Sequence, residues 1–214
     1  RSPVRSVAMP LTRTTDDATA ATRLLVVRHG QSEWNAVGRW QGRADPPLTM
    51  EGQRQAAAAA RALGSFDAVV ASPLQRAAET ATLIAEHLGI GPVLVEPDLM
   101  ERDAGEWQGL TRGQIEMDWP GYLEQGKRPP GYEPDDVMLE RVMAALDRVA
   151  QRAGGGEVLV VAHGGVVYTL EDSCGEPWRR LENLGARWFE ISDGSLTAGP
   201  RMELIPDGTL PDVL

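Results

Sequence analysis

The chain has 214 residues, of which 42% are hydrophobic, and its formal net charge at pH 7 is −10. This length suits one large domain with a sizeable core, and the single cysteine, Cys174, excludes an intrachain disulfide bond. The acidic balance argues against nucleic acid and anionic membranes as partners. No apolar run is long enough to span a bilayer, and no apolar stretch follows the N-terminal arginines as in a signal peptide, so we expect a cytoplasmic protein.

Strands and helices are expected to alternate along the chain. Residues 1–22 lack hydrophobic periodicity, which predicts a flexible leader followed by a single domain over 23–214. Short apolar runs predict buried strands, whereas Ala-rich or amphipathic segments predict helices. In chain order we expect a strand at 24–27, a loop at 31–48, a helix at about 50–63, a strand at 67–71, a helix at about 72–88, a brief strand at 93–95, an irregular stretch at 99–133 with a short helix near 111–118, a helix at 135–152, a strand at 157–162, and late strands at 186–191 and 202–205.

Local signals predict where some of these helices begin, end and pack. Ser72 followed by Pro73 predicts an N-cap with proline in the first helical position, and Gly89 predicts the end of that helix. The helix at 135–152 places four apolar residues on one face, which is therefore expected to pack on the core. These residues are Met138, Val142, Leu146 and Val149.

The alternation predicts an α/β fold, with a three-layer α/β/α sandwich, a mostly parallel central sheet and helices on both faces. Ligands in such folds bind beyond the carboxyl ends of the strands. Two predicted strands end in a histidine followed by glycine, at His29 and His163, and we expect these histidines to share one site. The remaining histidine, His87, lies late in a predicted helix and is expected at the surface.

The tripeptide Arg28-His29-Gly30 suggests phosphate chemistry. A neutral imidazole is a competent nucleophile, an arginine offers a planar fork of donors to phosphate oxygens, and glycine lets the backbone approach a ligand. Taken alone, each histidine is also compatible with an ordinary hydrogen-bonded residue at a strand end. The pair is more informative than either.

The segment from Leu25 to Asn35 resembles the signature of the histidine phosphatase superfamily, which includes the cofactor-dependent phosphoglycerate mutases. Further matching blocks follow in the family's order, and together they span roughly residues 24–168. These blocks are Arg39-Trp40-Gln41-Gly42, Asp45, Leu48-Thr49 and Gly52; Ser72 to Ala81; Glu101 and Gly105 to Gly109; and Ala162-His163-Gly164-Gly165. Because the blocks match in order, the chain is identified as a member of this family.

The resemblance implies a role for each matching residue. His29 would be the transiently phosphorylated nucleophile, and Glu101 would protonate the leaving oxygen. Arg28, Arg76 and His163 would surround and neutralise the phosphoryl group. Two arginines and an imidazolium provide the charge stabilisation that phosphoryl transfer needs, without a metal or another cofactor. The implied substrate-binding residues are Arg28, Asn35, Gln41, Gly42, Arg76, Glu101, Arg102, His163 and Gly164.

Some of these residues have a second interpretation. Arg76 is also compatible with a surface arginine, although a cation is disfavoured in the first turn of a helix unless an anion binds there. Residue type alone does not separate Glu101 from its acidic neighbours Asp98, Asp103 and Glu106. Trp107 is expected in the core, and Trp40 either in the core or at the rim of a pocket.

The implied activity is that of a metal-independent phosphoric monoester hydrolase of the histidine acid phosphatase type, acting through phosphohistidine. The alternatives are a phosphoglycerate mutase-type transfer between hydroxyls of a sugar acid, and a non-catalytic binding module, which the intact catalytic positions disfavour. The short stretch at 119–134 favours the phosphatase, because a smaller lid admits water more easily. Lys127 and Arg128 resemble mutase residues that bind a substrate carboxylate, but they are also compatible with ordinary loop cations.

The expected partner is a small phosphorylated metabolite. Trp34, Trp40, Trp107 and Met100 suggest a partly apolar pocket. A sugar phosphate, a phosphoglycerate derivative, a nucleotide or a cobalamin precursor would fit such a site. Members of the family are often dimers, so the resemblance leaves a homodimer open.

Overall fold

A computed structural model describes residues 21–205 of the chain, and most of the predicted leader lies outside this part. The strands are β1 (Thr22–Arg28), β2 (Ala68–Ala71), β3 (Leu94–Val95), β4 (Gly156–Ala162), β5 (Gly185–Ser192) and β6 (Ser195–Glu203). The helices are α1 (Glu33–Ala36), α2 (Met50–Ala62), α3 (Gln75–Leu88), α4 (Arg112–Asp118), α5 (Asp135–Ala153) and α6 (Gly164–Ser173), with short 3-10 helices η1 (Pro97–Leu99) and η2 (Gly105–Trp107).

The strands form one mixed sheet in the order β3-β2-β4-β1-β5-β6. The first four in this order run parallel, whereas β5 is antiparallel to β1 and β6 is antiparallel to β5. The sheet is therefore mostly parallel, as predicted, with an antiparallel hairpin at one edge.

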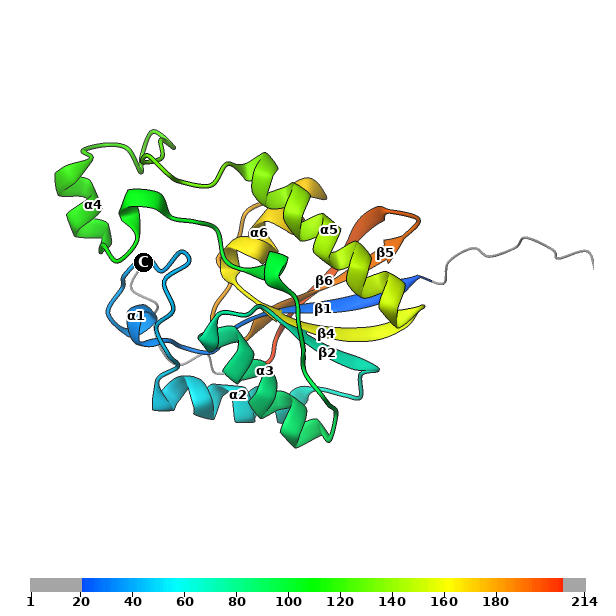
Figure 1. Ribbon diagram of the computed structural model, residues 1–214. Coiled ribbons are helices and arrows are strands. Elements are labelled where there is room, and N and C mark those ends of the chain that lie inside the picture. Colours follow the sequence, from blue (N-terminus) through cyan, green and yellow to red (C-terminus); the bar gives the residue numbers. More distant parts are fainter. Residues whose placement is uncertain (1–20, 206–214) are drawn as a thin grey trace, which may run out of the picture.

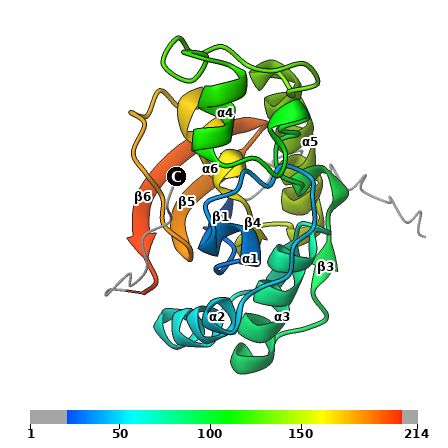
Figure 2. The same ribbon diagram turned by 90° about the vertical axis from the view of Figure 1, so that its left-hand side faces the viewer.

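Helices cover both faces of this sheet (Figure 1). The pair α2 and α3 lies on one face and the pair α5 and α6 on the other, a separation that is also visible after rotation (Figure 2). Side chains of β1 alternate between the two layers: Leu24 and Val26 pack with residues of α5 and α6, whereas Leu25 and Val27 pack with alanines of α2 and α3. The predicted three-layer sandwich is confirmed.

Two local predictions are also confirmed. Gly89 ends α3 in the left-handed conformation. The apolar face predicted for 135–152 is fully or almost fully buried. Within residues 21–205, no helix combines the length and apolar character that a bilayer crossing requires.

The start of α3 differs from the prediction. The helix begins at Gln75 with Leu74 as its N-cap, so the N-cap assigned to Ser72 is wrong. The Ser72 hydroxyl lies 2.7 Å from His163 Nε2 instead. The exposed N–H of Gln75 is satisfied by Asp45 Oδ1 at 2.6 Å, a partner that is 30 residues away in sequence. A tertiary contact thus replaces the local cap.

Helix α6 was not predicted. It begins with two glycines and continues with Val166 and Val167, residue types that favour a helix little by themselves. Both valines and Leu170 are fully buried against the sheet, and this burial outweighs the weak helix propensity.

Two strand boundaries also differ. Strand β6 begins at Ser195 rather than at 202, because Asp193 and Gly194 both have positive φ angles, of 50° and 73°, and make a tight hairpin turn after β5. Thr22, assigned to the leader, is buried and pairs with Gly156 and Ile191 in the sheet. Helix α1 occupies part of the predicted loop at 31–48.

Candidate active site

A cavity of about 690 Å³ lies at the carboxyl ends of the parallel strands. Nine residues predicted from the sequence line it, and His163 does not, because it lies fully buried behind His29. The nine are Arg28, His29, Asn35, Gln41, Gly42, Arg76, Glu101, Arg102 and Gly164.

Strand register brings the two histidines together. Arg28, the last residue of β1, pairs with Ala162, the last residue of β4, so the histidine that follows each strand occupies an equivalent position. The His29 amide donates to the Ala162 carbonyl at 3.1 Å, and the two imidazole centroids lie 5.3 Å apart in an edge-to-face arrangement.

Two hydrogen bonds determine the tautomer of His29. Its Nδ1 lies 2.6 Å from the Gly30 carbonyl, which can only accept, so Nδ1 carries the proton. Arg76 Nε–H, which can only donate, lies 3.2 Å from Nε2, so Nε2 keeps its lone pair. Burial, followed by the charges of Arg76 and Arg28, holds the pKa of His29 well below its ordinary value, although the Gly30 carbonyl raises it. The ring is a neutral imidazole that lines the cavity, and its Nε2 lone pair accepts from Arg76.

His163 is neutral as well. Burial, then Arg76 and His29, lower its pKa well below the ordinary value, and Nδ1 has no hydrogen-bond partner among the described residues. The lowered pKa favours the neutral ring in this arrangement, whereas the resemblance implies an imidazolium beside a phosphoryl group. Together with Ser72, the ring forms the wall on which His29 packs.

Arg76 is completely buried and is not a surface arginine. Besides the contact with His29, its Nη1 donates to the Ala44 carbonyl at 2.7 Å and its Nη2 to the Gly42 carbonyl at 3.0 Å. Burial lowers the pKa of Arg76 to about 10, partly offset by Glu101 and Asp45, so the guanidinium is charged at neutral pH. Gly42 thus orients Arg76 through its carbonyl.

Arg28 supplies a second buried guanidinium. Its Nη1 donates to the Leu181 carbonyl at 2.6 Å, and its side chain lines the cavity. Nearby, Asn183 Nδ2 donates to the His29 carbonyl at 2.9 Å. The sequence analysis assigned no role to Asn183 or Leu181, because nothing in the local pattern of residues 175–184 marks them as neighbours of β1.

Glu101 lies in an irregular segment between η1 and η2. Its Oε1 accepts from its neighbour Arg102 N at 2.6 Å, and its Oε2 accepts from Gly165 N, at the start of α6, at 3.0 Å. A Cβ at Gly165 would lie 2.1 Å from Glu101 Oε1, so only glycine leaves room for this carboxyl group. The acidic neighbours Asp98, Asp103 and Glu106 do not line the cavity.

Asn35 and Gln41 occupy the opposite rim. Asn35 is buried, and its Oδ1 accepts from the Ser32 amide in the capping box of α1 at 3.1 Å. Gln41 Oε1 accepts from the Ser32 hydroxyl at 2.7 Å. With both amide oxygens engaged, the NH2 groups of these side chains are the donors that remain for a ligand.

The outer part of the cavity combines Arg102, Trp40 and Arg128, which the sequence analysis named, with residues that it did not single out. Arg102 donates to Thr169 Oγ1 at 2.9 Å and pairs with Asp135 at 2.6 Å, which ties the site to α5 and α6. Trp40 lines the cavity, whereas Trp107 is fully buried in the core, as expected. Further lining residues are Arg39, Ala104, Arg128, Tyr132, Asp136, Leu139, Gly165, Tyr168, Asp172 and Trp178.

No group of three or more His, Cys, Asp and Glu side chains suited to a metal ion occurs among residues 21–205. Cys174 is a half-buried free thiol whose sulfur lies 3.8 Å from the Leu196 carbonyl, and it does not line the cavity.

Comparison with known proteins gives consistent matches. A family model described as the histidine phosphatase superfamily (branch 1) matches residues 24–197. The bifunctional protein Rv2228c of Mycobacterium tuberculosis is 42% identical over 150 residues, which cover 66% of this chain and 41% of that protein. The metal-independent phosphoserine phosphatase of Arabidopsis thaliana is 38% identical over 159 residues, covering 70% of this chain and 67% of that protein. A solved mycobacterial glucosyl-3-phosphoglycerate phosphatase, in complex with VO3, superposes with a TM-score of 0.72 at 30% identity, covering 80% of this chain and 97% of that one.

Proposed function

Because the chain belongs to the histidine phosphatase superfamily, we propose that it is a metal-independent phosphatase that hydrolyses small phosphomonoesters through a phosphohistidine at His29. The observation that carries this proposal is the neutral His29 ring, which lines the cavity with two buried arginines and whose unprotonated Nε2 lies 3.2 Å from Arg76 Nε. A neutral nitrogen nucleophile beside fixed positive charge suits attack on a phosphate dianion.

In the first step His29 Nε2 attacks phosphorus, and the bond from phosphorus to the ester oxygen breaks. Arg28 and Arg76 stabilise the charge on the transferring group, and Arg76 turns its Nε–H from Nε2 toward a phosphate oxygen. The hydrogen bond from Nδ1 to the Gly30 carbonyl holds the ring in place during this attack.

Glu101 in its protonated form gives its proton to the leaving oxygen, so an alcohol departs rather than an alkoxide. In the second step Glu101, now a carboxylate, takes a proton from water. The resulting hydroxide attacks the phosphohistidine, the bond from phosphorus to Nε2 breaks, and inorganic phosphate leaves. The two steps restore both residues.

A mutase-type transfer is the second candidate, and the position of Arg128 is compatible with it. Arg128 lines the cavity, with its guanidinium 5.2 Å from the Tyr132 ring centroid, where it can meet a carboxylate of a sugar acid. The same contact would serve a phosphatase acting on a carboxylate-bearing substrate. Phosphoserine and glucosyl-3-phosphoglycerate, which appear in the names of two relatives, are therefore suitable first substrates.

The first test is phosphate release from p-nitrophenyl phosphate in excess EDTA. We expect turnover by the wild type and a loss of at least about 10³-fold in His29→Ala. His87→Ala, which changes an exposed histidine late in α3, is the matched control and should keep full activity. Activity that survives in His29→Ala would contradict the phosphohistidine mechanism. Turnover of a sugar acid that depends on a bisphosphorylated primer would instead favour the mutase.

A further inference from the structure

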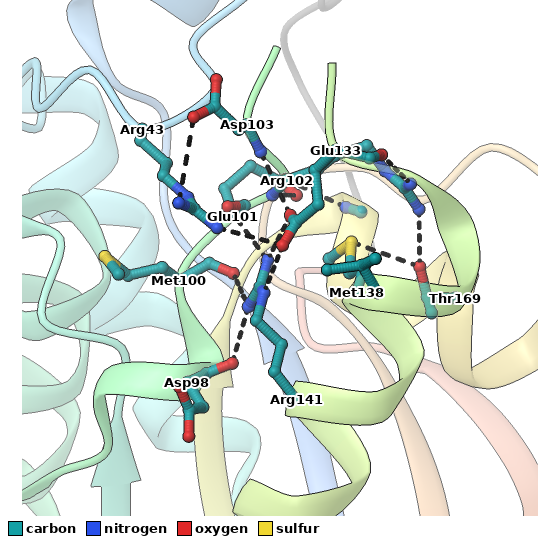
Figure 3. A network of polar contacts seen from close by, with 12 residues as sticks. Arg43, Asp98, Met100, Glu101, Arg102, Asp103, Glu133, Met138, Arg141 and Thr169 are labelled. Atoms are coloured by element: carbon teal, nitrogen blue, oxygen red, sulfur yellow. Dashed lines mark hydrogen bonds and ion pairs between the residues drawn. The ribbon is translucent and has the colours of Figure 1, made fainter. Parts of the chain in front are cut away.

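One side chain of α5 holds the segment that carries Glu101 through hydrogen bonds to its backbone (Figure 3). Arg141 Nη1 donates to the carbonyls of Asp98 and Met100 at 2.6 and 2.7 Å, and Nη2 donates to the carbonyl of Glu101 itself at 3.2 Å. Its Nε and Nη2 also donate to the two carboxylate oxygens of Glu133, both at 2.7 Å. A single guanidinium thus contacts three carbonyls of one irregular segment.

Glu133 is the partner of Arg141 in this network. Its carboxylate also accepts from the Asp103 amide at 3.2 Å and from Arg43 Nη2 at 3.0 Å. Burial raises the pKa of Glu133, but the hydrogen bond and charge of Arg141 outweigh this effect and lower it. The resulting ion pair is mostly buried, with 15% of the Arg141 side chain and 6% of the Glu133 side chain exposed. The segment from 98 to 103 is therefore fixed at both ends by one Arg–Glu pair.

Glu101 has little other support. The hydrogen bonds of its carboxyl group go to two backbone amides, those of Arg102 and Gly165, and to no side chain of the described residues. Its backbone belongs to neither a helix nor a strand. The position of the carboxyl group therefore depends on whatever holds the backbone of this segment, and Arg141 is the side chain that contacts the Glu101 carbonyl.

We propose that Arg141 is a positioning residue for proton donation, holding the backbone of Glu101 so that its carboxyl group meets the leaving oxygen. Arg141 does not line the cavity and touches no reacting atom. The inference rests on the proposed function, in which Glu101 protonates the leaving group. Replacing Arg141 should therefore slow the reaction most for the substrates whose leaving group most needs to be protonated.

The same helix offers a matched control. Arg148 lies on α5 seven positions after Arg141 and also binds the region before Glu101, but it does so through the side chains of Glu96 and Asp98 at 2.7 and 2.6 Å. It contacts neither the Met100 nor the Glu101 carbonyl. Arg148→Met therefore removes an ion-pair network of the same segment without releasing the proton donor.

The test compares kcat/KM for phenyl phosphate with kcat/KM for p-nitrophenyl phosphate, because kcat/KM reports the step in which the leaving group departs. The two substrates have similar shapes, but phenoxide is the stronger base and needs protonation more. The ratio of the two values does not depend on the amount of correctly folded enzyme. We expect Glu101→Gln to lower this ratio by about tenfold or more and Arg141→Met by about threefold or more, because general acid catalysis follows the basicity of the leaving group. Arg148→Met should keep the wild-type ratio.

Each outcome either supports or overturns the positioning role of Arg141. A normal ratio in Arg141→Met, with a lowered ratio in Glu101→Gln, would overturn the positioning role while leaving Glu101 as the proton donor. A normal ratio in Glu101→Gln would overturn the proton donor and the inference together. Arg141→Lys keeps the charge beside Glu133 but cannot reach all three carbonyls with one nitrogen. A lowered ratio in Arg141→Lys supports the geometric role, even if Arg141→Met does not fold, and a wild-type ratio overturns it.

Discussion

His29 and Arg76 form one unit at the scale of single residues. The guanidinium donates to the nitrogen that is proposed to attack, and two backbone carbonyls hold that guanidinium in place. The contact between Arg76 and His29 is not local in sequence, since the two residues are 47 positions apart. The family resemblance implied the nucleophile and its arginine, whereas the tautomer of the imidazole follows only from the Gly30 carbonyl and Arg76 Nε.

The sequence is compatible with two roles for Lys127 and Arg128, as ligands of a substrate carboxylate or as ordinary loop cations. The structure separates the two residues. Arg128 lines the cavity, with its guanidinium 5.9 Å from the Trp107 ring centroid, whereas Lys127 lies over Tyr122 and outside the lining. We expect Arg128→Gln to raise KM for phosphoserine by about tenfold, since a charge-assisted hydrogen bond contributes on the order of 1.5–3 kcal/mol. KM for p-nitrophenyl phosphate, which has no carboxylate, should change little.

Lys127→Gln is the matched control for this prediction, and steady-state kinetics on both substrates is the measurement. An equal rise of KM for both substrates in Arg128→Gln would mean that Arg128 acts on the phosphate or on the fold. It would not then be a ligand of the carboxylate.

At the scale of elements, the N-terminus of α6 serves both folding and the site. Its first residues follow His163, and its Gly165 amide donates to Glu101. The sequence pattern missed this helix because glycine and β-branched residues favour it weakly, and the tertiary packing of Val166, Val167 and Leu170 overrides that preference.

The substitution Gly165→Ala tests whether the N-terminus of α6 positions the carboxyl group of Glu101. A Cβ there would meet the end of the Glu101 side chain, which is flexible, so the protein should fold while the carboxyl group is displaced. We expect kcat for phenyl phosphate to fall by about tenfold or more, because a displaced general acid loses its contribution. Gly113→Ala is the control: it lies in α4, and a Cβ there meets nothing within 4 Å.

For Gly113→Ala we expect full activity and a free energy of unfolding that rises by about 0.5–1 kcal/mol, since alanine favours a helix more than glycine does. Urea denaturation and steady-state kinetics on both variants provide the measurements. Wild-type turnover in Gly165→Ala would show that Glu101 does not need its observed position.

At the scale of the whole molecule, the sheet buries two neutral histidines beside two arginines. Both histidines have pKa values below the ordinary value of about 6.5. As pH falls through 6.5, the unfolded chain therefore takes up protons that the folded chain does not. Stability is then fully present above about pH 6.5 and is lost as pH falls toward the folded-state pKa values, by up to about 1.4 kcal/mol per pH unit for each histidine.

We expect His163→Gln to reduce the slope of the free energy of unfolding against pH between about pH 6.5 and 5. Urea denaturation at several pH values gives this slope for the variant and the wild type. Above pH 7 the two slopes should coincide, which serves as the internal control. Identical slopes below pH 6.5 would indicate that His163 is protonated in the folded protein as easily as in the unfolded chain.

Much of the fold and part of the site could be predicted from local patterns. Apolar runs located the parallel strands, the spacing of Met138, Val142, Leu146 and Val149 located the buried face of α5, and the histidines after β1 and β4 located the cavity. These patterns are informative because strand and helix periods, and the common edge at which parallel strands end, are set by backbone geometry.

Only the tertiary structure decided how the site is held. Asp45 at the start of α3, Asn183 on the His29 carbonyl and Arg141 behind Glu101 are separated from their partners by 30, 154 and 40 residues. No periodicity relates residues so far apart. The sequence by itself determined which side chains are able to perform the chemistry, because reactivity belongs to the residue type. The protonation and the orientation of these side chains depend on burial and on distant hydrogen-bond partners, which exist only once the chain has folded.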